Sequence, residues 1–414
     1  MKDKDKKLSR RDFIRSAGVT GISSLFVLGS GLSRQAFAEE EKEKKEKKKE
    51  ETGKMPMRKF GKTGVPVSIL SLGGIIDFMT NQILLKKALD SGVTYWDTAD
   101  CYNGGNSEEG IGKFFAKFPE ARKKIFLVTK SDERDPKGMT RLLNRSFERM
   151  KTDYIDLYFI HGLRNVNELS DEMKAWVEKA KKENKIKFFG FSTHRDMADQ
   201  MLGASKLGWI DGIMMKYNFR MMHEDKMKRA VEACHKAGIG LTAMKTQGGG
   251  PVKTDSDEEM KMAGKFLEKG YTPEQAKIKA VWGEEAIASI CSQMPNLTIL
   301  GANIAAAKDK KSLKTSDLNR LRIYAKNTCS GYCAGCAQKC EGVMGEDAYI
   351  SDVMRYMMYH KNYGDAARAR ELFAAIPPEA RKKMRRLNYA AAERVCPNNL
   401  PIGSIMREAT DILT

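Results

Sequence analysis

Short apolar runs alternate with longer amphipathic stretches from about residue 55 onward. The apolar runs are typical of buried strands, and they lie at residues 67–72, 94–96, 125–129, 155–160, 186–191, 212–217, 239–244 and 297–300. Between them, apolar positions recur at helical spacing at about residues 81–91, 107–118, 137–151, 171–183, 224–237 and 273–294. Eight alternations of strand and helix predict an α/β fold, a parallel (β/α)8 TIM barrel over residues 55–310.

Residues 311–414 have a different pattern, with helical spacing and few strand signals. We expect helices at residues 350–358, 365–375 and 378–394. The barrel is therefore followed by a small all-helical C-terminal region, which contains most of the cysteines of the chain. In a barrel of this kind the chemistry is expected at the C-terminal ends of the strands.

The first 54 residues have no pattern typical of a packed core. Arg10-Arg11, followed by Phe13 and Ile14, resembles a twin-arginine export signal. A mildly apolar Gly/Ser-rich run and Ala36-Phe37-Ala38 follow, so residues 1–38 are predicted to be a signal peptide. Residues 39–54 are almost all Glu and Lys, a charged linker. We therefore expect a periplasmic or otherwise exported protein that meets the twin-arginine export machinery.

Composition excludes two classes of partner. An apolar content of 41% suits a soluble globular chain, and the apolar run of the signal is too short for a stable membrane span. The net charge is +19, but the lysines are scattered and no nucleic-acid reader motif is present, so no nucleic-acid partner is expected. The basic surface favours anionic substrates or phosphate-bearing cofactors.

Polar side chains stand at the ends of three consecutive predicted strands. Asp97 follows the strand at 94–96, with Tyr102 five positions later, while Lys130 and His161 follow the next two strands. A nearby Lys130 is expected to lower the pKa of the Tyr102 phenol, with Asp97 holding Lys130 in place. His161 is expected to donate to a carbonyl oxygen and orient it. Tyr102 is then the general acid that protonates that oxygen as hydride reaches the carbon.

These residues resemble the aldo-keto reductase family. The resemblance covers about residues 55–310 and includes the Asp-Thr-Ala-x-x-Tyr motif at 97–102 and Ser-Glu-Glu-Gly-Ile-Gly at 107–112. It implies hydride transfer between a small-molecule carbonyl or alcohol substrate and a nicotinamide dinucleotide, NADP or NAD. The matching cofactor positions are Ser192, Thr193, Asn218, Lys245, Gly301 and Asn303. Two positions depart from the family, because Met214 replaces a glutamine and Met244 replaces an aromatic ring.

The five cysteines of the last quarter suggest a metal centre. Cys329-x3-Cys333-x2-Cys336-x3-Cys340 is followed much later by Cys396-Pro397. Close thiols of this kind predict one 4Fe-4S cluster, held either by three of the close cysteines with Cys396 or by all four close ones. Cys333 and Cys336 belong to both sets. Zinc and, in an oxidising compartment, disulfides are the alternatives.

Two functions are compatible with these patterns. The first is an exported oxidoreductase of aldo-keto reductase type, in which Tyr102 is the general acid/base and the cluster is an electron relay or a structural pin. The second is an exported electron-transfer or binding protein on a degenerate barrel without nicotinamide turnover, which exchanges electrons with an envelope partner. Met214 and Met244 motivate the second.

Overall fold

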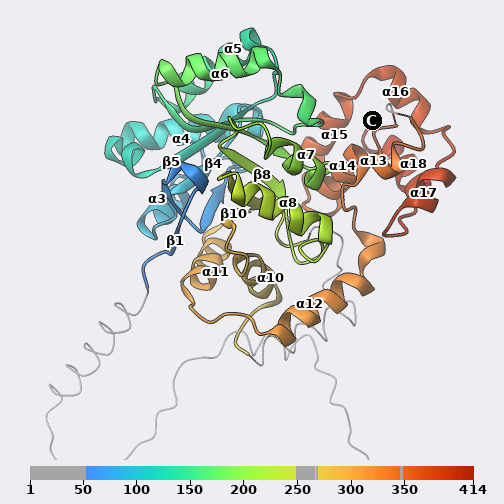
Figure 1. Ribbon diagram of the computed structural model, residues 1–414. Helices are drawn as coiled ribbons and strands as arrows, with labels where there is room; N and C mark the ends of the chain where they lie inside the picture. The colour runs from blue at the N-terminus through green and yellow to red at the C-terminus, as the bar shows by residue number, and fades with distance from the viewer. Residues whose placement is uncertain (1–52, 249–265, 267–268, 346–347) are drawn as a thin grey trace, which may run out of the picture. The chain divides into compact units, whose positions relative to one another are not determined.

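The computed structural model describes residues 53–248, 266, 269–345 and 348–414 (Figure 1). Eight parallel strands form a closed barrel, in which each strand pairs with the next and the last pairs with the first. The strands are β3 (Leu70–Gly73), β4 (Tyr95–Asp97), β5 (Phe126–Ser131), β6 (Ile155–Ile160), β7 (Ile186–Thr193), β8 (Gly212–Lys216), β9 (Gly240–Met244) and β10 (Ile287–Gln293). The predicted (β/α)8 barrel is thus confirmed.

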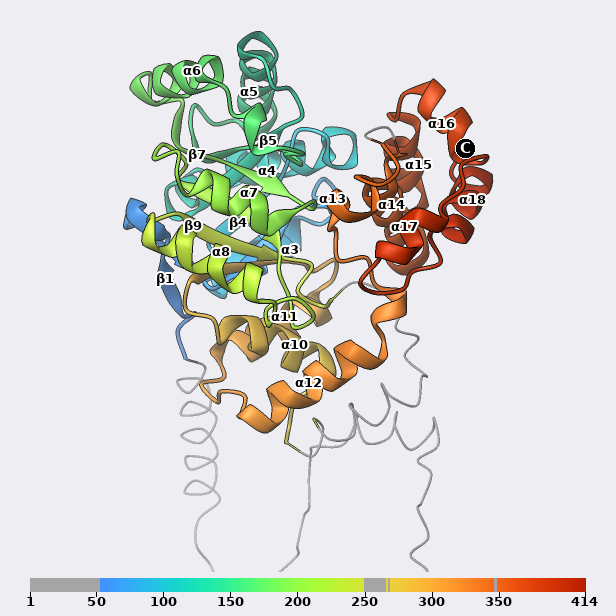
Figure 2. The same cartoon turned by 45° about the vertical axis from the view of Figure 1, so that its right-hand side comes forward.

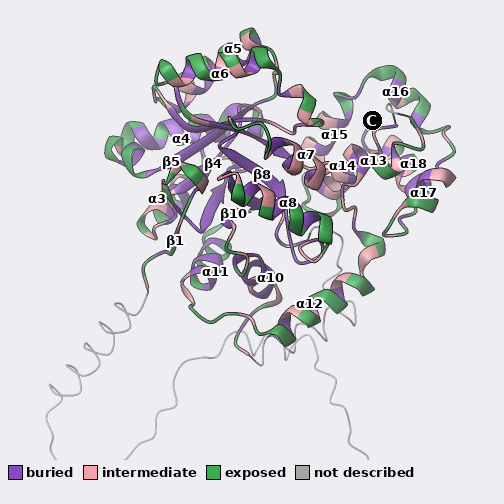
Figure 3. Cartoon of the chain, in the orientation of Figure 1, coloured by how far each residue is buried: buried purple, intermediate pink, exposed green. Residues whose placement is uncertain are grey.

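Helices follow the strands and cover the outside of the barrel. They are α3 (Gln82–Asp90), α4 (Asn106–Lys117), α5 (Pro136–Met150), α6 (Asp171–Lys182), α7 (Met197–Ala204), α8 (Asp225–Lys236), α10 (Pro273–Trp282) and α11 (Leu297–Lys308). Local chemistry sets their starts, as at α5, where Pro136 opens the helix and the Asp135 side chain accepts from Gly138 N at 2.9 Å. Most of these helices have exposed residues toward solvent, while the strands are mostly buried (Figure 3).

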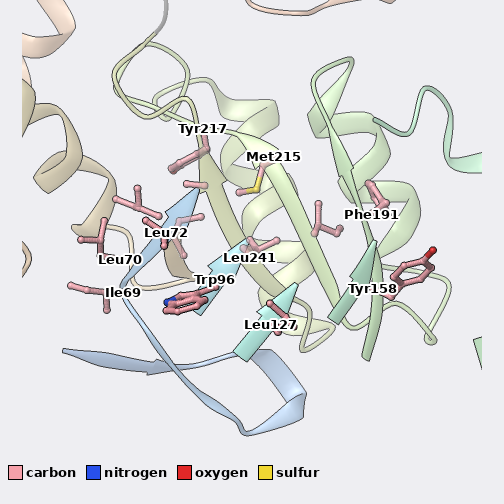
Figure 4. Close-up of a cluster of buried hydrophobic side chains, with 14 of the residues drawn as sticks. Ile69, Leu70, Leu72, Trp96, Leu127, Tyr158, Phe191, Met215, Tyr217 and Leu241 are labelled. Carbon is pink, nitrogen blue, oxygen red and sulfur yellow. The ribbon is translucent and has the colours of Figure 1, made fainter. Parts of the chain in front are cut away.

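The main core lies between the strands and the surrounding helices. Side chains from neighbouring strands, among them Trp96, Leu127, Tyr158 and Phe191, contribute to it (Figure 4). Each of these four is at most 1% exposed, so the layer excludes water around the strands. Burial of this continuous apolar layer is the main free-energy gain that closes the sheet into a barrel.

An antiparallel hairpin closes the N-terminal end of the barrel. Its strands are β1 (Met57–Lys59) and β2 (Pro66–Ser68). Between them Phe60, which is fully buried, packs its ring 5.4 Å from that of Phe126. The first residues of β8 and β9 are glycines, and a Cβ at Gly240 would lie 2.5 Å from the Phe60 ring, so the plug requires a residue without a side chain there. Water is excluded from this end, which leaves the opposite end for chemistry.

Two of the predicted strands are corrected by the structure. The run at residues 67–72 is split, because Ile69 separates β2 of the hairpin from β3 of the barrel. Residues 297–300 were expected as the eighth strand but begin α11, since the Asn296 side chain accepts from Ile299 N at 2.9 Å and caps a helix. The eighth strand is β10, inside the stretch expected to be helical.

Residues after the barrel form the expected helical region. It contains α12 (Thr315–Asn327), α13 (Ala337–Cys340), α14 (Ile350–Asn362), α15 (Ala366–Ala374), α16 (Pro378–Met384), α17 (Ala390–Val395) and α18 (Ile402–Ile412) (Figure 2). It has its own core, with Val353, Phe373 and Met406 at 1% exposure or less. The helix expected over 378–394 is broken into α16 and α17.

The sequence also led to predictions about membrane-spanning helices and about residues 1–54. Among the described residues, no helix is both long and apolar enough to cross a membrane. The signal peptide at 1–38 lies outside the described residues, as does nearly all of the linker at 39–54.

Candidate active site and cysteine centre

Asp97 and Lys130 form a buried ion pair at the carboxyl ends of β4 and β5. The Lys130 Nζ lies 2.7 Å from Asp97 Oδ1 and 2.8 Å from Oδ2, and it also donates to Thr98 O at 2.6 Å. The two side chains are 1% and 3% exposed. Burial raises the pKa of Asp97 above its usual value, and the attraction of Lys130 opposes this shift. The expected pairing of these residues is therefore present.

Tyr102 follows β4 and lies against the same ammonium group. The Lys130 Nζ is 4.7 Å from the centroid of the phenol ring. Asn103, at φ 49°, turns the chain after Tyr102 and leads into α4. The ring of Tyr102 meets that of His161 edge to face, with centroids 5.5 Å apart. The four residues predicted from the strand ends thus meet at one mouth of the barrel.

The pKa of Tyr102 differs from the sequence expectation. Burial raises it well above 10, and the neighbouring Asp97 carboxylate adds to the increase. The expected lowering by Lys130 is wrong here because that ammonium group faces Asp97 and Thr98 O, so its charge is balanced by the carboxylate. The phenol is therefore protonated, which is the form that a general acid requires.

His161 is held by Asp132, a residue that the sequence did not reveal. The His161 Nδ1 lies 3.0 Å from Asp132 Oδ1 and 3.6 Å from Cys101 Sγ. Burial lowers the pKa of His161, while the Asp132 carboxylate opposes that shift. In the neutral ring Nδ1–H donates to Asp132, so Nε2 is an acceptor, and donation from Nε2 requires the imidazolium form that Asp132 stabilises.

Cys101, Asp132 and His161 together also have the residue types and the spacing of metal ligands. The ligand atoms of Cys101, Asp132 and His161 all lie within 4.8 Å of one another. However, the Arg368 guanidinium, from α15, lies 3.3 Å from Cys101 Sγ, and Lys130 is close by. Two positive charges at this position disfavour a bound cation, so we interpret the group as a hydrogen-bonded support of His161.

The motif at 107–112 fixes the loop that carries Tyr102. Ser107 Oγ donates to Gly74 O at 2.7 Å, and its oxygen lies 2.7 Å from Thr98 Oγ1. Glu108 is fully buried and accepts from Thr129 Oγ1 at 2.6 Å and from Ser146 Oγ at 2.7 Å. These bonds join the start of α4 to β3, β5 and α5. The motif is therefore a support for the site and not part of the reacting group.

Ser192 and Thr193, expected near a nicotinamide carboxamide, make bonds within the barrel. Ser192 Oγ accepts from Gly162 N at 3.0 Å. Thr193 Oγ1 donates to Leu163 O at 3.0 Å. Both side chains are at most 1% exposed. They hold the loop that follows His161.

Asn218 and Lys245, expected to bind the same cofactor, instead contact the helical region. The Asn218 side-chain amide donates to Lys245 O and to the Tyr332 hydroxyl, each at 3.1 Å. Lys245 Nζ donates to the Tyr359 hydroxyl at 3.2 Å. Although burial alone would raise it, Lys245 lowers the pKa of Tyr359 to about 8, with help from Arg355. The polar groups of both cofactor positions are therefore engaged by Tyr332 and Tyr359.

Gly301 and Asn303 complete the six cofactor positions and lie on α11, not on a loop after a strand. Gly301 is exposed, and nothing lies within 4 Å of a Cβ built on it. Asn303 donates to Ser292 Oγ at 3.0 Å. Asn218 and Lys245 bond to the helical region, and Gly301 and Asn303 lie on a helix, so this arrangement departs from the expected nicotinamide site.

Four of the five C-terminal cysteines line one small cavity, here called the thiol cavity. They are Cys333, Cys336, Cys340 and Cys396. Cys329 lies outside and lines a separate cavity with Phe219 and His223. All eight cysteines lie in the described part of the chain and are free thiols. Burial raises the pKa of Cys336 to about 11 and that of Cys340 to about 12, and the Cys333 thiol contributes to both. The structure thus brings together the set that includes Cys396.

Comparison with known proteins agrees with this fold. The family model described as the Aldo/keto reductase family matches residues 70–294. The oxidoreductase YqkF of Bacillus subtilis, itself uncharacterized, is 27% identical over 305 residues, which are 66% of this chain and 97% of that protein. The aldo-keto reductase yakc [NADP(+)] of Schizosaccharomyces pombe is 28% identical over 215 residues, which are 47% of this chain and 62% of that protein.

A solved structure has the same fold. The aldo-keto reductase AKR11C1 from Bacillus halodurans, in its holo form, superposes with a TM-score of 0.54 at 22% identity and covers 65% of this chain and 96% of that chain. The chain spans less than two thirds of the length of the first curated relatives that it matches, 62–63%.

The chain thus has a closed parallel barrel with a buried group of Asp97, Lys130 and Tyr102 at its mouth. The family match covers more than half of the sequence. The chain belongs to the aldo/keto reductase family, whose members use NAD(P).

Removal of Lys130 tests the buried pair. We expect Lys130→Met to lower the free energy of unfolding by about 3–5 kcal/mol, because it leaves the Asp97 carboxylate buried without a counter-charge. The double variant Asp97→Asn with Lys130→Met is expected to lose less than the single one. Lys86→Met is the matched control, because Lys86 pairs with Asp90 at a site about half exposed and its loss costs at most about 1 kcal/mol.

Urea denaturation of the four proteins measures these differences. Equal destabilisation by Lys130→Met and Lys86→Met would show that the buried pair is not a stabilising constraint.

Proposed function

We propose that this protein is an oxidoreductase of aldo/keto reductase type that interconverts a small carbonyl compound and its alcohol. The observation that carries the proposal is the buried group of Asp97, Lys130 and Tyr102, with His161 beside it, at the carboxyl ends of the strands. Membership of the family supports the same reaction. In reduction the carbonyl carbon gains a hydride equivalent from a two-electron donor, NAD(P)H as in the family or another reduced carrier, which is oxidised, and the carbonyl oxygen gains a proton.

The residues of this chain account for the proton half of the reaction. In reduction, the Tyr102 O–H bond breaks and the proton passes to the substrate oxygen, leaving a phenolate. The Lys130 ammonium group, fixed by Asp97, is close enough to the ring to stabilise that negative charge. His161, whose Nδ1 is held by Asp132, lies beside the Tyr102 ring and helps to position the substrate there. In alcohol oxidation the proton moves in the opposite direction.

Replacement of the phenol tests this role. Tyr102→Phe is expected to lower kcat for NADPH-linked reduction of pyridine-3-carboxaldehyde by about 10²–10⁴-fold, with KM little changed, because only the transferred proton is lost. Tyr154→Phe is the matched control, since Tyr154 immediately precedes β6, at the end of the barrel opposite the site, where its ring packs on Arg122. Steady-state kinetics with NADPH, and with reduced methyl viologen as donor, measure the effect. Full turnover by Tyr102→Phe would remove Tyr102 as the acid.

A second function is favoured by one specific observation. Because Asn218 and Lys245 donate to Tyr332 and Tyr359, the expected nicotinamide position is engaged by the helical region. This supports the alternative that the protein transfers electrons or binds a ligand without nicotinamide turnover. The alternative is distinguished by the NADP(H) content of the purified protein, since full occupancy contradicts it.

We further propose that the thiol cavity holds a 4Fe-4S cluster. Such a cluster, when bound, takes up and releases single electrons. The donor set fits, because four thiols line one cavity, those of Cys333, Cys336, Cys340 and Cys396. Their spacing disfavours zinc, whose Zn–S bonds of about 2.3 Å bring sulfurs to about 3.8 Å apart. Within the described residues, the cysteines of this cavity form no set of three ligand atoms all within 4.8 Å.

Serine variants distinguish the two candidate ligand sets. Cys396→Ser is expected to remove most of the iron and the absorbance near 400 nm, because it deletes one of four ligands. Cys329→Ser is the matched control from the same loop and is expected to keep about four irons per chain. Iron analysis and visible spectra of anaerobically purified proteins provide the measurement. The opposite outcome, with iron lost from Cys329→Ser and kept by Cys396→Ser, would assign the cluster to the four close cysteines.

Export through the twin-arginine pathway is also a proposal, supported by Arg10-Arg11 and the segment that follows. That route carries folded proteins and suits a chain that acquires a cluster before export. Replacement of both arginines by lysine in the full-length chain is expected to retain the protein in the cytoplasm. Cell fractionation with an antibody to the protein measures the distribution, and unchanged export of the variant contradicts the proposal.

A further inference from the structure

A cavity of about 250 Å³ lies between the carboxyl ends of β7–β9 and the helical region. We call it the basic pocket. Its barrel side is formed by His194, Lys216 and Lys245, and its other walls include Met354, Met357 and Leu400. Most of its surface is apolar, with cationic groups on the barrel side. This combination is typical of sites for small molecules, in which a few polar groups orient a mainly apolar ligand.

Two lysines of the basic pocket have no carboxylate partner within the described residues. Lys216 is only 7% exposed, and its Nζ donates to Cys333 O at 2.9 Å. Lys245 is half-buried and donates to the Tyr359 hydroxyl. Lys216 faces a neutral carbonyl oxygen, and Lys245 faces a phenol whose pKa it lowers to about 8, so neither ammonium group pairs with a carboxylate in the described part of the chain. A buried positive charge without a counter-ion is costly, so its presence points to an anionic ligand.

The other cations of the pocket are paired. Arg355 bonds to Asp352 at 2.9 Å, and Lys361 bonds to Glu408 at 2.6 Å. The contrast separates structural ion pairs at the edge of the pocket from the two lysines without an acid.

The surroundings of His194 show that the basic pocket is strongly positive. Its Nδ1 is buried and has no hydrogen-bond partner within the described residues. Burial lowers the pKa of His194 well below its usual value, and the charges of Arg355, Lys245 and Lys216 lower it further. The ring is therefore neutral, and the surroundings are strongly positive. An anion placed between the lysines is the group that such surroundings stabilise.

We propose that the basic pocket binds a small organic anion, with its acidic group between Lys216 and Lys245 and its apolar body against Met354, Met357 and Leu400. This inference does not depend on the proposed carbonyl chemistry, because none of the residues that line the pocket belongs to the Tyr102 group. The volume suits a molecule of one or two rings and is below the usual range for larger ligands, so the occupant is not a whole dinucleotide.

The position of the pocket relates the ligand to the cysteines. Cys333 lines both the basic pocket and the thiol cavity, and its carbonyl oxygen accepts from Lys216. A molecule bound in the basic pocket therefore lies against the loop that carries the thiols. This distinguishes the site from a surface patch and gives it a structural connection to the cysteine centre.

The test uses a matched pair of fluorescent probes on the full-length protein. One is 8-anilinonaphthalene-1-sulfonate, which has an apolar body and one negative charge. The other is N-phenyl-1-naphthylamine, which has the same body without the charge. We expect saturable binding of the sulfonate, weakened at least tenfold by Lys216→Met and by Lys245→Met. The neutral probe is expected to bind weakly and to be unaffected by either change.

Lys361→Met is the control, because Lys361 lines the same pocket but already pairs with Glu408. It is expected to change the sulfonate affinity by less than twofold. Thermal unfolding confirms that each variant is folded. Because Lys216 and Lys245 lie on separate segments of the chain, the test can still be carried out if one of the two variants does not fold.

Three outcomes overturn the proposal. The first is equal sulfonate binding by the wild-type protein and both variants, which indicates adsorption elsewhere. The second is that Lys216→Met and Lys245→Met weaken the binding of the neutral probe as much as that of the sulfonate. The third is stoichiometric displacement of the sulfonate by NADPH, which assigns the pocket to a dinucleotide. Carbonyl turnover that survives Lys216→Met leaves the proposed function standing whatever happens to probe binding.

Discussion

The buried ion pair between Asp97 and Lys130 constrains the whole mouth of the barrel. An ammonium group that is 1% exposed needs a carboxylate and further acceptors within bonding distance, or its desolvation is not offset. Asp97 and Thr98 O supply these acceptors from the neighbouring strand end. The pair therefore fixes β4 against β5, and Tyr102, five residues after Asp97, takes its place from this register. The proposed proton transfer therefore depends on a structural requirement that exists before any substrate binds.

The sequence revealed this group because its members follow apolar runs. Asp97, Lys130 and His161 each end a short buried strand, and strand ends in a parallel barrel meet at one rim. Asp132, which holds His161, follows Ser131 in a polar stretch and has no such pattern. The eighth strand was missed for a related reason, since Asn296 caps a helix over an apolar run while β10 mixes apolar residues with Ser and Cys. Local capping thus prevailed over apolar character.

The cofactor positions show a second limit of sequence interpretation. Asn218 has the residue type and place expected for a nicotinamide contact, but its amide bonds to Tyr332, 114 residues later in the chain. Lys245 likewise reaches Tyr359, again 114 residues away. Residue type determines what a side chain can bond to, but long-range packing determines which partner it meets. Contacts with the helical region therefore give these barrel residues bonding partners that their residue types alone do not predict.

The cysteine loop has a structural role in the barrel whether or not its thiols hold iron. Lys216 bonds to Cys333 O, Asp196 N donates to Gly335 O at 2.8 Å, and a Cβ at Gly335 would lie 2.4 Å from His194 O. Two strand ends are thus in close contact with residues between the thiols. A shift of the loop by about an ångström would change the hydrogen bond between Lys216 Nζ and Cys333 O and the shape of the pocket beside it. These short polar contacts join the cysteine loop to the carboxyl ends of the barrel strands.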